Sequence, residues 1–202
     1  MFPGGRIHAF LLRGCATQSD VERASIQVDA LIRELQDSSA RAQKLFAERA
    51  PQQLLHRPGE KSWSAAECLE HFNLSNRAYL ARLEPILADL RSRNVLAVKP
   101  FRLNWNAALL KYWLEPPSRL RLPTGASFQP LPVQETAASL RNCCALNLQL
   151  VGLLESSRGL ALDQTALVSP FAKSMKYSAY SAFALIAAHN RRHLWQAERA
   201  SR

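Results

Sequence analysis

Residues 177–200, near the C-terminus, have the sequence YSAYSAFALIAAHNRRHLWQAERA, which predicts a long α-helix. Its apolar and histidine positions recur every three or four residues, which is the spacing of one face of an α-helix: Ala182, Ile186, His189, His193 and Ala197. His189 and His193 therefore project from that face about one turn apart. An unpaired imidazole is costly in a buried stripe, so the two rings require hydrogen-bond partners or a metal ion.

Three further amphipathic helices can be traced upstream. Their apolar residues keep the same three- and four-residue spacing, over about 19–49, 64–93 and 133–156. The second helix is expected to begin at Ser64, because Glu67 three residues later completes a capping box. Pro51 is expected to end the first helix or to follow its end closely. Pro85 is expected to kink or divide the second.

The segment 94–133 is a long connection between the second and third of these helices. The sequence predicts a short extra helix over 101–114, followed by a turn-rich stretch with five of the 11 prolines. Four helices with one long crossover predict an all-α fold, a four-helix bundle whose long connection between helices two and three carries the short helix.

The chain of 202 residues suits one domain with a full hydrophobic core. The N-terminus superficially resembles a signal peptide, but its short apolar run ends at Leu12 and Arg13 follows directly, whereas such a peptide needs about 7 to 15 apolar residues. We expect residues 1–16 to be a disordered or loosely attached extension and residues 17–202 to form the single bundle domain.

The remaining sequence features bear on the compartment. No apolar run approaches the roughly 20 residues that a membrane span requires, so no membrane association is expected. Four cysteines, two of them adjacent at Cys143 and Cys144, do not resemble a disulfide framework. The sequence therefore predicts a reducing, cytoplasmic location.

The formal net charge of +10 comes mostly from scattered arginines. A nucleic-acid-binding protein usually concentrates its charge on one face among aromatic residues, so nucleic-acid binding ranks last among the functions considered. The nearest approach to such a patch is segment 99–121, with Lys99, Arg102, Lys111, Arg119 and Arg121 among Trp105, Tyr112 and Trp113. That segment suits a pocket for an anionic ligand, although a basic solvated surface is the simpler interpretation.

Two strings, RPGEKSWSAAECLEHF at 57–72 and AAHNRRHLWQA at 187–197, resemble the DinB-like superfamily, and within it the YfiT-like branch of metal-dependent proteins. The resemblance implies a four-helix bundle with a long connection after the second helix. It also implies that a histidine of helix two and an H-x-x-x-H pair of helix four bind a divalent ion. In this sequence these are His71, His189 and His193. By periodicity alone, His71 lies only at the edge of the buried helix face.

Three neutral imidazoles leave the charge of a divalent ion undiminished, so such an ion lowers the pKa of bound water to about 7. Nickel or zinc is expected first, with iron or copper as alternatives. The resemblance implies relatives that are thiol S-transferases and a thiol-dependent isomerase, so a small-molecule substrate such as a low-molecular-weight thiol is expected. Hydrolysis is the other chemistry that fits.

Two further alternatives concern assembly and role. A non-catalytic, metal-stabilised binding or stress-response module is the main alternative to an enzyme. Many relatives of this bundle are dimeric, and the apolar helix faces allow a homodimer.

Six other residues are candidates for supporting roles at the site. Glu67 lies one turn before His71 and either accepts a hydrogen bond from its ring or serves only as the capping acid. Cys68 is either a thiolate ligand or, as we favour, a small buried apolar residue. Tyr180 and Asn190 are candidates for contacts that support the ligand residues. Trp105 and Trp113 are candidates for the pocket mouth.

Overall fold

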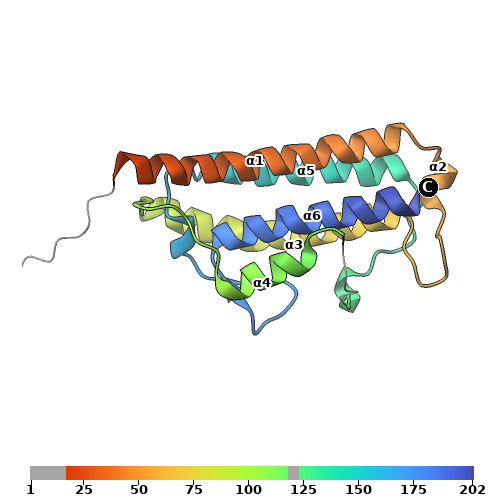
Figure 1. Cartoon of the computed structure of the whole chain (residues 1–202). Helices are drawn as coiled ribbons and strands as arrows, with labels where there is room; N and C mark the ends of the chain where they lie inside the picture. The colour runs from red at the N-terminus through yellow and green to blue at the C-terminus, as the bar shows by residue number, and fades with distance from the viewer. Residues whose placement is uncertain (1–16, 118–122) are drawn as a thin grey trace, which may run out of the picture.

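A computed structural model describes residues 17–117 and 123–202, and Figure 1 shows the course of the chain. The elements follow one another as α1 (Gln18–Ala47), α2 (Pro51–Leu55), α3 (Ala65–Ser92), α4 (Trp105–Leu114), η1 (Ala126–Phe128), α5 (Thr136–Glu155), η2 (Leu162–Gln164), β1 (Leu167–Val168), β2 (Lys176–Tyr177) and α6 (Ala179–Ala200). The extension predicted over residues 1–16 lies outside the described residues. Within the described ranges, no helix is both long and apolar enough to cross a membrane.

The four long helices form a bundle, so the predicted all-α fold is confirmed. In Figure 1, α1 and α5 lie side by side in one layer, and α3 and α6 lie side by side in the other. Contacts also join α3 to α5 and α1 to α6, so each long helix touches two neighbours. The buried apolar faces of all four helices meet between the layers, as their three- and four-residue spacing predicts.

Side-chain caps begin three of the four long helices. Thr17, Ser64 and Ser178 each accept a hydrogen bond from a backbone N–H of the first turn. At α3 the cap is reciprocal, because the Glu67 carboxylate accepts from the backbone N–H of Ser64 at 2.9 Å. The capping box therefore fixes the start of the helix that carries His71, at the position that the sequence predicts.

Two proline-related expectations have different outcomes. α1 ends at Ala47, before Pro51, as predicted, and Pro51 then occupies the first turn of the short helix α2. The predicted division of α3 at Pro85 is wrong, because the helix runs without a break from Ala65 to Ser92. Pro85 and Ala81 are exposed, so water can bind the carbonyl that loses its helical partner.

The long connection carries the predicted short helix, although α4 begins at Trp105 and not at 101. The preceding backbone is held elsewhere: Phe101 N–H donates to Gln27 Oε1 at 2.8 Å, and Asn104 N–H donates to Ser181 Oγ at 3.0 Å. From α4, which packs against α6, the chain continues to η1 on the same side of the bundle (Figure 1). This connection therefore covers the α3–α6 layer.

A polar layer crosses the apolar core. Asn76 of α3 and Asn190 of α6 both donate to Asn147 Oδ1 of α5, at 3.2 and 3.4 Å, and Asn147 Nδ2 donates to Ser39 Oγ of α1 at 3.0 Å. We call these four residues the asparagine layer. Because each long helix contributes one member, the layer favours one rotation and one axial position of each helix relative to the others.

Candidate metal centre

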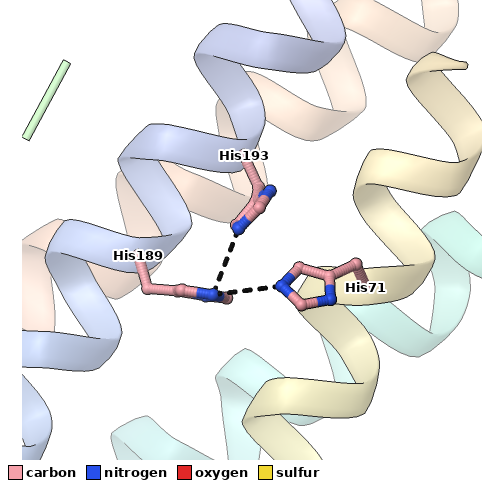
Figure 2. A group of neighbouring side chains, drawn as sticks. All are labelled: His71, His189 and His193. Atoms are coloured by element: carbon pink, nitrogen blue, oxygen red, sulfur yellow. Dashed lines mark hydrogen bonds between the residues drawn. The ribbon is translucent and has the colours of Figure 1, made fainter. Parts of the chain in front are cut away.

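His71, His189 and His193 meet at the interface between α3 and α6, and their rings face one another (Figure 2). The Nε2 atom of His189 lies 3.3 Å from Nε2 of His71 and 3.1 Å from Nε2 of His193. One nitrogen from each of the three residues lies within 4.8 Å of the other two. All three side chains are buried, so the cluster combines imidazoles from two helices that are largely shielded from bulk water.

Local structure explains how each ring reaches this point. His189 and His193 are four residues apart on α6 and therefore leave the helix on the same side. His71 leaves α3 from the edge of its buried face. Its ring packs against Trp63, with ring centroids 4.9 Å apart. Its Nδ1 lies 2.6 Å from the carbonyl oxygen of Phe128 in η1. A carbonyl only accepts, so Nδ1 carries the proton and Nε2 presents its lone pair to the cluster.

The surroundings favour neutral rings. Burial lowers the pKa of His71, and the positive charge of Arg192 lowers it further, against the opposing effect of the Phe128 carbonyl. Burial also lowers the pKa of His189 and His193 well below the ordinary value, and neighbouring imidazoles and Arg192 add to the effect. Neutral imidazole is the form that ligates a metal, so no proton needs to be displaced near pH 7.

The three residues fit a divalent ion. Nitrogens that each lie about 2.0–2.1 Å from a metal, at angles between tetrahedral and octahedral values, are separated by roughly 2.9–3.4 Å. The Nε2 separations of 3.1 and 3.3 Å fall in that range. The same Nε2 contacts are close enough for hydrogen bonds between the rings, whose direction depends on the tautomers of His189 and His193. When all three Nε2 atoms present lone pairs, a cation between them removes the repulsion of those lone pairs. The donor set of three imidazoles suits nickel, zinc, copper or iron.

The cluster lies at a cavity of about 970 Å³. Its walls come from the segment before α3, from η1 and from one face of α6. Apart from the histidines, the charged residues among the described lining are all basic: Lys61, Arg192 and Arg199. A small molecule that enters the cavity can therefore reach the three Nε2 atoms, and it meets positive charge there.

Comparison with protein families points to the same assignment. The sequence profile of the DinB superfamily matches residues 34–197, which is most of the chain and includes all three histidines. This chain belongs to the DinB superfamily. Comparisons with curated proteins and with solved structures gave no match.

Two candidate residues beside the triad have roles other than ligation. The Glu67 carboxylate caps α3 and forms an ion pair with Arg57, and the Phe128 carbonyl, not Glu67, accepts the hydrogen bond of His71. Burial raises the pKa of the Cys68 thiol to about 12, which disfavours a thiolate. Cys68 lies on the cavity wall outside the histidine cluster of this DinB protein.

The other four candidates lie away from the DinB triad. The Tyr180 hydroxyl accepts from Gln27 at 3.4 Å, and Asn190 belongs to the asparagine layer. The structure describes Trp105 and Trp113, which the sequence placed at the pocket mouth, as partly or largely exposed residues of α4. Trp105 is 80% exposed and Trp113 is 40% exposed, and neither is among the described residues that line the cavity.

The basic segment 99–121 also contributes differently from the expectation. Within its described part, only Leu110 and Leu114 line the cavity. Lys99 and Arg102 border a separate, smaller hollow, and Arg119 and Arg121 lie outside the described residues. Among the described residues, the cavity of this DinB protein takes its positive charge from Lys61 and from α6.

Sequence reasoning missed Phe128 and Arg192. The role of Phe128 lies in its backbone carbonyl, which has no sequence signal. Arg192 could have been found, because it is three residues after His189 and next to His193, on the same side of the predicted helix. Its Nη1 donates to the carbonyl of Trp113 at 3.0 Å, which holds the guanidinium beside the triad.

Proposed function

We propose that this protein is a metal-dependent enzyme in which His71, His189 and His193 hold a divalent ion at a substrate cavity. The observation that carries the proposal is the convergence of three buried, neutral imidazoles on one point of the cavity wall. A purely structural histidine cluster has no need of a substrate-sized opening beside it. Nickel and zinc are the first candidates for the ion.

The side chains around the cavity limit which reactions the proposed metal centre can support. When bound, such an ion supplies Lewis-acid chemistry and makes a thiol or a water molecule available as a nucleophile near neutral pH. The Phe128 carbonyl holds His71 in the tautomer that ligates, and Arg192 adds positive potential that favours an anionic nucleophile. No Asp or Glu occurs among the cavity-lining residues that the structure describes, so these residues offer no carboxylate for proton transfer to or from water.

We therefore favour transfer of an electrophilic group to a low-molecular-weight thiol over hydrolysis. A thiol needs less help to lose its proton, because its ordinary pKa is about 8.5 and that of bulk water is about 15.7. The sulfur would attack from the cavity side of the triad and form a bond to the electrophilic atom of the second substrate. The bond from that atom to its leaving group would break, and the thiol proton would pass to the leaving group or to solvent.

The first experiment is elemental mass spectrometry on protein purified without a histidine tag. The wild type, His189→Ala and the exposed-loop control His56→Ala are compared. We expect near-stoichiometric nickel or zinc in the wild type and in His56→Ala, and loss of the metal in His189→Ala. A wild-type protein that is metal-free and does not take up added nickel or zinc would sink the proposal.

A substrate screen then separates an enzyme from a metal-stabilised binding module. Thiol transfer and ester hydrolysis are measured with the metal-loaded wild type and with His193→Ala. Turnover that is lost in the variant supports an enzyme. A protein that retains metal but has no turnover in either assay supports the binding module instead.

A further inference from the structure

One face of α6 runs along the cavity from the triad to the end of the helix. Five residues of this face line the cavity, and each follows the last by three positions, except for the adjacent Arg192 and His193: His189, Arg192, His193, Gln196 and Arg199. Arg199 lies six positions after His193, which corresponds to about 9 Å along an α-helix. The cavity therefore has an inner end at the histidines and an outer end near Arg199.

The outer end is built from two exposed cations. Arg199 lies over the Trp195 ring, with its guanidinium carbon 5.0 Å from the ring centroid. Lys61 belongs to the segment between α2 and α3, and Figure 1 shows this segment beside the C-terminal end of α6. Stacking on an aromatic ring limits the freedom of the guanidinium and leaves its N–H groups available to an anion.

These cations differ from a basic residue on another side of α6. Arg191, the neighbour of Arg192, pairs with both Glu34 and Glu115. Among the described residues, neither Lys61 nor Arg199 forms an ion pair with a carboxylate, and no Asp or Glu lines the cavity. The positive charge at the outer end is therefore uncompensated within the described structure.

We propose that the cavity takes an elongated organic anion whose reactive group lies at the histidines and whose carboxylate or phosphate lies between Lys61 and Arg199. The inner half of this site rests on the proposed function, and the outer half rests on the two cations alone. Trp63 and Trp195 supply apolar surface between the two ends. A guanidinium and an ammonium can bind the oxyanion through charge-assisted hydrogen bonds.

Four thiols test the site as probes of charge and length. The protein is loaded with Co²⁺ and titrated with 6-mercaptohexanoate, 6-mercaptohexan-1-ol, 3-mercaptopropionate and 3-mercaptopropan-1-ol. The thiolate-to-cobalt charge-transfer absorption gives each Kd. For the six-carbon pair, we expect the acid to bind about tenfold more tightly than the alcohol. For the three-carbon pair, which is too short to reach Arg199 from the triad, we expect no comparable difference.

Substitutions then locate the effect. The double variant Lys61→Gln/Arg199→Gln is expected to lose the tenfold preference for the long acid. The control Arg77→Gln, which removes an exposed charge from α3 outside the cavity, is expected to keep it. An equal preference for acid over alcohol in the short pair, or a preference that survives the double substitution, would overturn the outer anion site.

The two proposals fail in different ways. If no thiol produces a charge-transfer band, the open metal centre of the proposed function is wrong, and the elongated site falls with it. If all four thiols produce the band with equal affinity for acid and alcohol, the metal centre stands and only the outer anion site is wrong.

Discussion

The Nδ1 atom of His71 lies 2.6 Å from the carbonyl oxygen of Phe128, and the two residues are 57 positions apart in the chain. The bundle supplies the imidazole, and the long connection supplies the acceptor that sets its tautomer. Phe128 is held there by its own ring, whose centroid lies 4.4 Å from that of Phe171. The connection therefore takes part in the histidine cluster through a backbone carbonyl.

The first prediction concerns this contact. Phe128→Ala removes the ring that anchors η1, so the carbonyl is held less firmly against His71. We expect metal affinity to fall by roughly tenfold or more, as is typical when a hydrogen bond behind a metal ligand is lost. Competition with a chromophoric chelator measures the Kd. Leu131→Ala, at an 80% exposed position of the same connection, is the control and should leave the Kd unchanged. Equal affinity in both variants would contradict the role of η1.

The second prediction separates Cys68 from the ligands. Burial raises the pKa of this thiol to about 12, so we expect it to remain a thiol at neutral pH. Cys68→Ala should therefore keep the full metal content measured by elemental analysis. The folded wild type should also resist alkylation at Cys68 by iodoacetamide, detected by peptide mass spectrometry. A variant that loses its metal would identify Cys68 as a ligand after all.

The third prediction concerns acid stability. Burial alone would raise the pKa of Glu67, but hydrogen bonds from Arg57 and Ser64 outweigh it and hold the pKa below the ordinary value of 4.5. The ionised carboxylate therefore contributes stability that is fully present above pH 4.5 and is lost as the pH falls through the lowered pKa. We expect Glu67→Gln to show a shallower loss of stability in acid than the wild type.

Chemical denaturation at a series of pH values measures this effect. The matched control is Glu84→Gln, which removes an exposed carboxylate from the same helix. Its pH profile should follow that of the wild type. If the Glu67→Gln profile also follows the wild type, the ion pair with Arg57 does not contribute to stability in acid.

The fourth prediction concerns the asparagine layer. Asn147→Ala removes the oxygen that accepts from Asn76 and Asn190, and it leaves both buried donors without that partner. We expect a loss of about 2–4 kcal/mol in the free energy of unfolding, measured by urea denaturation. Gln149→Ala, at an exposed position of the same helix, should change it by less than about 0.5 kcal/mol. A small effect at both positions would mean that water replaces the lost oxygen.

The features that the sequence predicted correctly depend only on residues that are close to one another in the chain. The apolar spacing and the capping box at Ser64 located the long helices, and the four-residue spacing of His189 and His193 placed them on one face of α6. His71 needed the family resemblance, because its position at the edge of the α3 stripe depends on how two helices cross. That crossing is a tertiary property, which no single-helix pattern contains.

The differences from the sequence-based expectations have the same origin. Trp105 and Trp113 lie on α4, which turns both side chains partly or largely toward solvent, and a pattern of aromatic and basic residues does not contain that orientation. Pro85 was expected to divide α3 because the rule for helix interiors takes no account of solvent on the outer face. Phe128 was overlooked because a backbone carbonyl has no residue-type signature.

The ordering of residues along α6 has a consequence for the history and engineering of such a site. The ligands occupy the middle of the helix, and the outer cation and Gln196 follow in its last two turns. Substitutions at 196 and 199 can therefore alter which molecules the cavity accepts while His189 and His193 stay in place. Under the proposed function, new selectivities can arise from single codon changes at these two positions, which leave the metal-binding histidines unchanged.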